Sequence, residues 1–386
     1  MTLARHGTGP RATLAAVASQ VHPVFMAPPL AASGFGAVLG GFTAPRLTLL
    51  HLLVVFWALY TAHVVDGLVD FHHRGEDDDH PLTRRGCHLA LAGSTAWVFV
   101  GVVGLAILVD PVAALLSLPG WIVAILHAPR LDTHPVGATL GYPVGIGFAL
   151  LGGYYVQTRT LSTTALAFAA IFVTVLAGIK VVDDATDYAY DRSIGKRTVA
   201  VVVGRDGARR LATALMGAGM TAVLALSLTG VVPRSSALAV VPFVTVALVA
   251  RRADAALATK LLVRASYLFF AVLVLAVWLR PLAGVSVPDV TALGPYTYLA
   301  TEVVWGAVAL ALVVRAGAVR AAARTVAVLY PVAYVWDWYT LTVGVFAIPM
   351  RTGVDLLGIP VEEHLFILVV PAMVVGVHEL LNDESS

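Results

Sequence analysis

Long apolar runs recur along almost the whole chain, and they limit its fold more than any other feature. Runs of this length can cross about 30 Å of hydrocarbon as a helix, which satisfies its own backbone hydrogen bonds. We therefore expect an all-α, polytopic membrane protein. The predicted helices cover residues 25–42, 46–66, 88–109, 111–127, 135–156, 162–182, 208–230, 236–250, 261–279, 295–314, 325–346 and 361–381.

The composition supports a membrane protein and argues against several other classes of protein and kinds of site. Of 386 residues, 59% are hydrophobic and only 12% are charged, against roughly a quarter in soluble domains. The net charge of +2 argues neither for a nucleic-acid partner nor for an acidic one. The single cysteine, Cys87, excludes an internal disulfide or a thiolate metal site. Residues 1–20 lack a long apolar core, so no removable signal peptide is expected.

Basic residues are distributed unequally between the two sides of the predicted bundle. Alternating the loops puts twenty Lys and Arg on one side, and only Arg46, Arg159, Arg234, Arg280 and Arg351 on the other. The positive-inside rule then predicts a multi-pass protein of the cell membrane with both termini cytoplasmic. A linker at 282–294, flanked by Pro281 and Pro295 and containing Pro288, separates a nine-helix domain, 20–281, from a three-helix domain, 295–381.

Charge is concentrated in two short segments, 66–86 and 180–197, which hold 17 of the 48 charged residues. Four predicted helices separate these segments, so both lie on the cytoplasmic face. Aspartates recur in them at i, i+4, a spacing that places side chains on one face of a helix. The candidate metal ligands are Asp66, Asp70, Asp183, Asp187 and Asp191.

These aspartates predict a magnesium site. A carboxylate at membrane depth costs roughly 2.5–3.5 kcal/mol on insertion scales, so a compensating cation is expected. Hard carboxylate oxygens suit Mg²⁺, which commonly also binds phosphate oxygens. Lys196 and Arg197 follow the second segment and would contact a diphosphate. The run 76–79 is expected to be ordinary loop charge, and the histidines at 63, 72, 73, 80 and 88 match no known metal-binding spacing.

Over residues 20 to 281 the chain resembles the UbiA superfamily of intramembrane prenyltransferases. That family has an NxxxDxxxD motif and a DxxxDxxxD motif; here the first reads AHVVDGLVD, with Ala62 at the asparagine position, and the second matches fully. The resemblance implies a nine-helix bundle and Mg²⁺-dependent transfer of a prenyl group from an allylic diphosphate to a hydrophobic acceptor. DHPLTRRG resembles the family's RPLxxG stretch, which implies a diphosphate contact for Arg84 or Arg85. The Tyr188 ring is a candidate to face the allylic cation.

Four acids mark the last three predicted helices: Glu302, Asp337, Glu362 and Glu363. Helix direction places all four in the half of the bilayer away from the cytoplasm, where they would form one acidic site. YTYL, WDWY and PVEE resemble the membrane lycopene cyclase domain. The resemblance implies acid–base cyclisation by these carboxyls. Known members pair two such repeats, so a second copy or a partner cyclase chain would complete the unit.

Together the two resemblances predict a lycopene elongase of carotenoid biosynthesis. It would transfer a dimethylallyl group to lycopene, and the C-terminal repeat would cyclise the end group. The alternative acceptor is a quinone precursor or a glycerol lipid, with a non-catalytic C-terminal repeat. An ion-coupled transporter would also use buried acids, but it explains neither the paired aspartate motifs nor the absence of visible inverted repeats.

Overall fold

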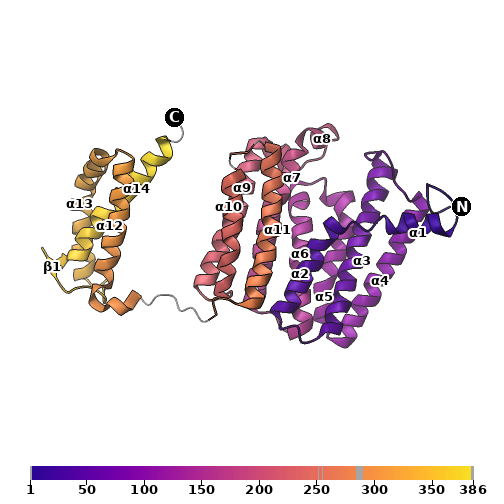
Figure 1. The fold of residues 1–386 in the computed structure, drawn as a ribbon, viewed down its shortest axis with the longest axis horizontal. Helices are drawn as coiled ribbons and strands as arrows, with labels where there is room; N and C mark the ends of the chain where they lie inside the picture. The colour runs from indigo at the N-terminus through magenta and orange to yellow at the C-terminus, as the bar shows by residue number, and fades with distance from the viewer. Residues whose placement is uncertain (1, 251, 254, 284–289, 384–386) are drawn as a thin grey trace. The chain divides into compact units, whose positions relative to one another are not determined.

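The computed structural model describes residues 2–250, 252–253, 255–283 and 290–383, and almost all of them are helical (Figure 1). The chain forms two compact units, Met1–Gly284 and Val285–Ser386. Residues 284–289 of the predicted linker lie outside the described residues. The helices of the first unit are α1 Pro10–Ala18, α2 Pro23–Leu39, α3 Pro45–Val69, α4 Arg84–Leu108, α5 Pro111–Leu126, α6 Pro135–Thr158, α7 Thr163–Thr186, α8 Tyr188–Ser193, α9 Val199–Leu228, α10 Val240–Ala250 and α11 Ala255–Leu279.

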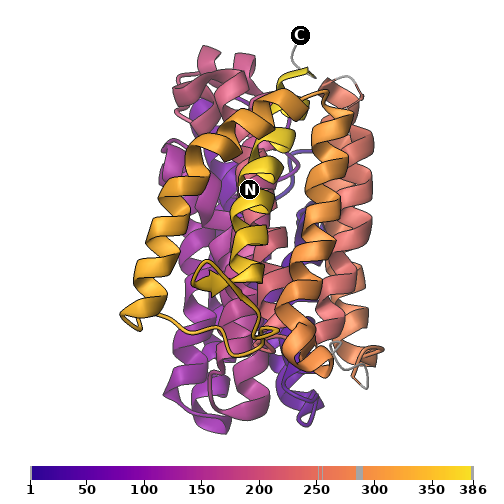
Figure 2. The same cartoon turned by 90° about the vertical axis from the view of Figure 1, so that its left-hand side faces the viewer.

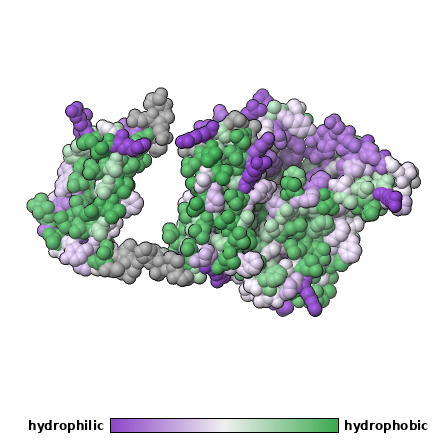
Figure 3. All heavy atoms as spheres, in the orientation of Figure 1, coloured by the Kyte–Doolittle hydropathy of each residue, from purple (hydrophilic) through white to green (hydrophobic). Residues whose placement is uncertain are grey.

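The predicted all-α membrane fold is confirmed. Among the described residues, nine helices are long and apolar enough to cross a membrane, and α1 with α2 forms a further candidate, bent by 59°. The short 3₁₀ helix η3, Arg234–Ala239, continues into α10 as a shorter apolar segment. Figure 3 shows apolar residues over the flanks of the first unit and hydrophilic ones gathered at the end that carries α8.

Several helices begin earlier than hydropathy predicts, among them α9 and α13, Val319–Thr342. α9 begins at Val199 instead of residue 208, capped by the Thr198 side chain, and contains a break at Gly204 (φ 78°). α13 begins six residues before the predicted 325. In both cases the first turns carry arginines, which lower the local hydropathy although the backbone is already helical.

Glycines allow α2 and α6 to pack at backbone contact distance. A Cβ built on Gly36 of α2 would lie 2.1 Å from the Leu150 carbonyl oxygen of α6. A Cβ on Gly153 of α6 would lie 2.1 Å from the Ser33 carbonyl oxygen of α2. Phe35 of α2 then stacks on Phe172 of α7, with ring centroids 5.6 Å apart. Close helix approach at small residues is the usual packing mode in membranes.

The described part of the second unit contains the 3₁₀ helix η4, Val290–Tyr296, three α-helices and a short hairpin (Figure 2). α14, Val361–Asp383, packs against both α12, Thr297–Arg315, and α13. The strands β1, Asp355–Leu356, and β2, Ile359–Pro360, pair antiparallel just before α14. His364 in the first turn of α14 holds this hairpin, since its Nε2 donates to the Leu356 carbonyl at 2.8 Å and its Nδ1 accepts from the Tyr330 hydroxyl at 2.6 Å.

Adding one methyl group at Gly36 is expected to destabilise the first unit. Gly36→Ala must push α2 away from the α6 backbone, and overpacking of this kind costs about 1–3 kcal/mol. Gly34→Ala is the matched control on the same helix, because nothing lies within 4 Å of a Cβ there. That control should be neutral or stabilising by up to roughly 1 kcal/mol. Thermal unfolding in detergent measures both; equal melting temperatures would contradict the close contact.

Candidate functional site

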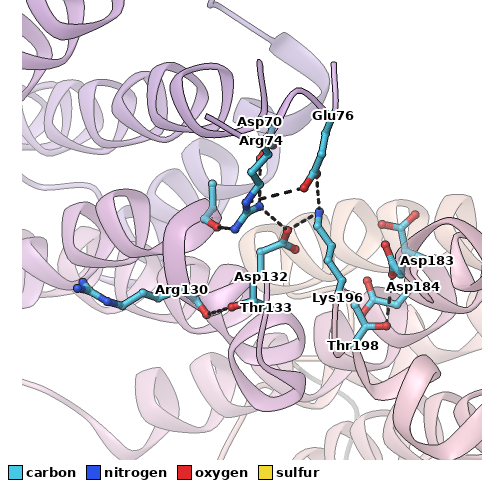
Figure 4. A network of polar contacts seen from close by, with 12 residues as sticks. Asp70, Arg74, Glu76, Arg130, Asp132, Thr133, Asp183, Asp184, Lys196 and Thr198 are labelled. Atoms are coloured by element: carbon cyan, nitrogen blue, oxygen red, sulfur yellow. Dashed lines mark hydrogen bonds and ion pairs between the residues drawn. The ribbon is translucent and has the colours of Figure 1, made fainter. Parts of the chain in front are cut away.

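Three connecting segments meet at one end of the first unit and bring the two aspartate segments together (Figure 4). α3 continues into a π-helical turn, η1, Asp70–Arg74. α5 continues into a second π-helical turn, η2, His127–Leu131, which Asp132 follows. The turn after α8 carries Lys196. Turns of this type inside helices often mark functional sites, because the extra residue per turn redirects side chains.

Ion pairs centred on Asp132 join these segments. The Asp132 carboxylate lies 2.6 Å from Lys196 Nζ and 4.0 Å from a terminal guanidinium nitrogen of Arg74. Lys196 Nζ also lies 3.6 Å from Glu76, and Arg74 lies 3.2 Å from Asp70. Glu76 is therefore part of the site, in contrast to its expected role as loop charge. The network connects the end of α3 to the turn that follows α8.

Burial and charge act in opposite directions on the central pair. Burial would raise the pKa of Asp132, but its hydrogen bond to Lys196 and the nearby positive charges hold that pKa below its usual value. Burial would lower the pKa of Lys196, yet Asp132 and the neighbouring carboxylates raise it. Both groups are consequently charged over the whole neutral pH range.

Asp66 and Asp70 lie at the junction of α3 and η1. Asp66 Oδ1 is buried, and it has no hydrogen-bond partner in the described part of the chain. Asp70, Asp132 and Lys196 are all within electrostatic range of Asp66. A buried carboxylate oxygen without a donor is costly, so this atom is suited to a cation.

The second aspartate segment bends instead of forming one continuous helical ladder. α7 ends at Thr186, Asp187 is non-helical, and α8 begins at Tyr188. Asp183 and Asp187 are exposed, whereas Asp191 is buried and accepts from the Thr198 hydroxyl at 3.3 Å. The bend therefore gives the three motif aspartates different surroundings.

Asp184 is buried beside this motif although it is not part of it. Its carboxylate pairs with Lys180 Nζ at 2.7 Å, and its Oδ2 has no hydrogen-bond partner among the described residues. Lys180 also lies 3.3 Å from Asp183. The i, i+4 spacing of Lys180 and Asp184 is visible in the sequence, whereas nothing along the chain marks Asp132, because its partners are far away in sequence.

The other predicted diphosphate contacts lie nearer the surface. Arg197 is exposed, and so are Arg84 and Arg85 at the start of α4. Arg84 contacts the exposed His73 ring at 3.1 Å. That these three residues contact a substrate stays a prediction.

Tyr188 is already engaged by cations of this chain. The Arg205 guanidinium lies over its ring, 5.1 Å from the centroid. Its hydroxyl accepts from Arg192 at 3.2 Å. One face of the ring is therefore covered, and its expected role towards a carbocation stays a prediction.

An apolar pocket of about 380 Å³ opens among α2, α6, α7 and α11. Tyr267 of α11 lines it and lies within electrostatic range of Asp183, so one lining residue is near the second aspartate segment. This volume is typical of small-molecule sites. Its lining residues are Val24, Ala27, Pro28, Ala31, Ala32, Phe35, Ile146, Phe172, Leu176, Tyr267, Phe270, Ala271 and Val274.

The second unit has its own buried acids. Glu363 Oε1 accepts from the Tyr298 hydroxyl at 3.0 Å, and Asp337 lies within electrostatic range of both residues. Glu302 is 5% exposed, is close enough to Glu363 to interact with it, and has no hydrogen-bond partner for its Oε2 among the described residues. We call Tyr298, Glu302, Asp337 and Glu363 the C-terminal acid cluster.

Glu362 has a different environment from this cluster. One of its oxygens accepts from the Thr352 backbone N–H and from the Thr352 hydroxyl, both at 2.7 Å. It thus stabilises the loop before β1, although its charge is close enough to affect Glu363. The structure places the four acids near one another, as the sequence predicted. Its contacts group Glu302, Asp337 and Glu363, whereas Glu362 has separate partners.

Comparison with known proteins identifies relatives of the first unit alone. Residues 25–273 match the model of the UbiA prenyltransferase family, and no curated protein sequence matches the chain. A structure described as digeranylgeranylglyceryl phosphate synthase has a TM-score of 0.58 at 14% identity, covering 69% of this chain and 99% of that one. A UbiA homologue from Aeropyrum pernix K1 gives 0.50 at 16% identity, covering 66% and 98%. A homologue from Archaeoglobus fulgidus bound to GPP and Mg²⁺ gives 0.49 at 15%, covering 69% and 99%.

Asp132→Asn is expected to lower the stability of the first unit in a pH-dependent way. The pKa of Asp132 is lower in the folded protein than in the unfolded chain, where it is about 3.9, so its ionised carboxylate stabilises the fold. This stabilisation is fully present above the unfolded-state pKa and is lost as the pH falls through the folded-state pKa. At pH 7 the loss should be about 1–3 kcal/mol, between the values for exposed and buried pairs. Melting temperatures of wild type and variant should converge in acid. Asp78→Asn, an exposed acid of a nearby loop, serves as control; a pH-independent difference would rule out this explanation.

Proposed function

The chain belongs to the UbiA prenyltransferase family, and we propose that this prenyltransferase transfers a dimethylallyl group from its diphosphate to lycopene. One observation carries the proposal for the reaction: a cluster of carboxylates paired with partly buried cations lies near a residue that lines an apolar pocket. The charged part suits a diphosphate, and the pocket suits an isoprenoid chain.

The residues at the charged end fit Mg²⁺ as cofactor. Asp66, Asp70, Asp183, Asp187 and Asp191 would hold it, since they offer hard oxygens and Asp66 Oδ1 has no hydrogen-bond partner among the described residues. When bound, Mg²⁺ would supply positive charge that neutralises the diphosphate leaving group.

Lys196 and Arg74 would bind the diphosphate directly. Both already point their charged groups at carboxylates, so a diphosphate would replace one set of anions with another. Asp132 holds the two cations in position beforehand, which lowers the cost of organising the site. Arg84, Arg85 and Arg197 would contact the outer phosphate oxygens from the surface.

The pocket would protect the reactive carbon from water. As the allylic carbon–oxygen bond breaks, its electron pair leaves with the diphosphate and the prenyl carbon becomes electrophilic. The rings of Phe35, Phe172 and Phe270 line an apolar space in which an alkene of the acceptor attacks before water can. The acceptor then loses a proton, which restores its double bond and completes the transfer.

The C-terminal acid cluster supports a carotenoid acceptor. Its helices resemble the lycopene cyclase repeat, and its carboxyls lie in an apolar bundle. There Glu302, Asp337 and Glu363 would cyclise an end group by adding a proton to an alkene and removing another, without net redox change. Glu362 would support them by fixing the adjacent loop. A second copy of the chain or a partner cyclase chain would supply the other repeat.

A glycerol lipid is the alternative acceptor, with the C-terminal unit in a non-catalytic role. The fold similarity to digeranylgeranylglyceryl phosphate synthase favours this alternative, although at 14% identity it concerns the fold alone. A quinone precursor belongs to the same alternative class. Expressing the chain in a lycopene-producing host and measuring pigment masses separates these acceptors. Products heavier by one or two five-carbon units support the carotenoid proposal; unchanged lycopene moves it to lipid or quinone acceptors.

Neutralising the magnesium ligands should abolish prenyl transfer. Asp66→Asn and Asp191→Asn each remove a negative charge from the proposed metal site, and activity should fall at least about 100-fold, the scale of one lost electrostatic stabiliser. Transfer is measured in detergent or vesicles at saturating Mg²⁺. Asp78→Asn, exposed on the loop after η1, is the matched control and should keep full activity. Active Asp66 and Asp191 variants would contradict this metal assignment.

Glu363→Gln should separate the two proposed activities. It keeps the size of the side chain but removes the carboxyl that binds the Tyr298 hydroxyl, so prenyl transfer should persist while cyclised end groups disappear. Glu379→Gln, at the other end of α14, is the control. Mass and absorption spectra of the pigments measure both steps. Identical end groups in all three proteins would mean that the C-terminal unit is not a cyclase.

A further inference from the structure

A second group of potential metal ligands lies beside the aspartate site, and its donors are of a different chemical type. His72 belongs to η1, His80 to the segment between η1 and α4, and Cys87 to the first turn of α4. One ligand atom from each lies within 4.8 Å of the other two. His80 and Cys87 are buried, and His72 is partly buried. We call these three residues the His–Cys cluster.

Three distances in and around the cluster are close to the edges of a tetrahedral metal site. Cys87 Sγ lies 3.8 Å from His80 Nδ1. The Leu82 carbonyl oxygen lies 3.2 Å from His80 Nδ1 and accepts a hydrogen bond from His72 Nε2 at 3.0 Å. When a metal ion replaces the proton of His72 Nε2, this oxygen would form a fourth corner. Zinc bonds of about 2.0–2.3 Å give tetrahedral edges of roughly 3.3–3.7 Å. Small shifts of these atoms would therefore accommodate a metal ion.

Surrounding residues orient His80 as a ligand. Gln20 Oε1 lies 3.3 Å from His80 Nε2 and accepts a hydrogen bond from its N–H, so Nδ1 keeps the lone pair. The Leu82 N–H donates to that lone pair at 3.3 Å, and a metal ion would take its place. A Cβ at Gly67 would lie 2.0 Å from His80 Nε2, so only glycine on α3 admits the ring in this position. The N-terminal segment covers the cluster, because Ala4 pairs with Leu82 as in a β-bridge and Arg5 lies over Phe71 at 4.2 Å.

We propose that the His–Cys cluster binds one zinc ion, separate from the aspartate site. Imidazole and thiolate ligands suit Zn²⁺, whereas the aspartates offer the hard oxygens that suit Mg²⁺. Binding displaces the thiol proton of Cys87, which leaves to solvent, and forms a metal–sulfur bond. The ion fixes the segment from η1 to α4 under the N-terminal segment. Since η1 also carries Asp70 and Arg74, zinc stabilises the loop that presents them.

The proposed zinc site would differ from the expectation from the sequence that a single cysteine excludes a thiolate metal site. That expectation was based on the single cysteine and on the lack of a known metal-binding spacing among the histidines. Here the ligands are separated by eight and seven positions, and a π-helical turn and a loop bring them together. Two histidines and one backbone carbonyl would supply the other three ligands, so no further cysteine is needed.

Cobalt substitution tests the proposal directly. Co²⁺ bound to a thiolate shows a sulfur-to-metal charge-transfer band in the near ultraviolet, and Cys87 is the only cysteine of the chain. We expect this band to saturate at one Co²⁺ per purified full-length protein and to disappear when Zn²⁺ is added. Excess Mg²⁺ should leave it unchanged. X-ray absorption of the zinc-loaded wild type should show one sulfur and two imidazole ligands.

Variants then assign the ligands. Cys87→Ser and His80→Ala should each lose the band, and His72→Ala should weaken Co²⁺ binding at least about tenfold. His88→Ala, exposed beside Cys87 on α4, is the matched control and should keep the wild-type spectrum. Absence of the band in folded wild type, or a zinc spectrum with oxygen ligands alone, would overturn the proposal. Those readouts require no prenyl transfer, so they are independent of the function proposed above.

Discussion

The first unit depends on how buried carboxylates are neutralised at the end of an apolar bundle. Asp132 lies at the centre of the ion-pair network, because it pairs with Lys196 from the turn after α8 and with Arg74 from η1. Without these cations, the aspartates on three connecting segments would repel one another in a medium that screens charge poorly. The same network keeps cations ready for an anionic ligand. Structural stability and a capacity to bind diphosphate therefore rest on the same contacts.

Hydropathy was sufficient to locate every predicted helix, because a bilayer requires long apolar helices whatever their packing. It could not locate the starts of α9 and α13, where arginines belong to helical turns at the ends of the apolar segments. Motif spacing selected Asp66 and Asp191 as candidate ligands but could not anticipate the bend at Asp187. Asp132 could not be identified from the sequence, because it is a single aspartate in a short loop. Its role depends on partners that only the fold brings close to it.

The two units surround acidic side chains with different groups. In the first, carboxylates pair with the cations Lys180, Lys196 and Arg74. In the second, Glu302 and Glu363 are buried near each other, and a tyrosine hydroxyl is the nearest hydrogen-bond donor to Glu363. Under the function proposed above, the first environment would serve the leaving group and the second would serve proton transfer.

The π-helical turn η1 explains how two kinds of ligand can come from one short stretch of chain. In a regular α-helix, Asp70 and Arg74 would share a face, and His72 would point away from both at an angle fixed by the helix. The wider turn changes this angle, so that Arg74 reaches the Ala128 carbonyl at 2.6 Å while His72 reaches the Leu82 carbonyl at 3.0 Å. Asp70 pairs with Arg74 at 3.2 Å, so the carboxylate and the imidazole of this turn have different partners. Because ions select ligands by this chemical difference, a magnesium site and a zinc site can be neighbours without exchanging metals.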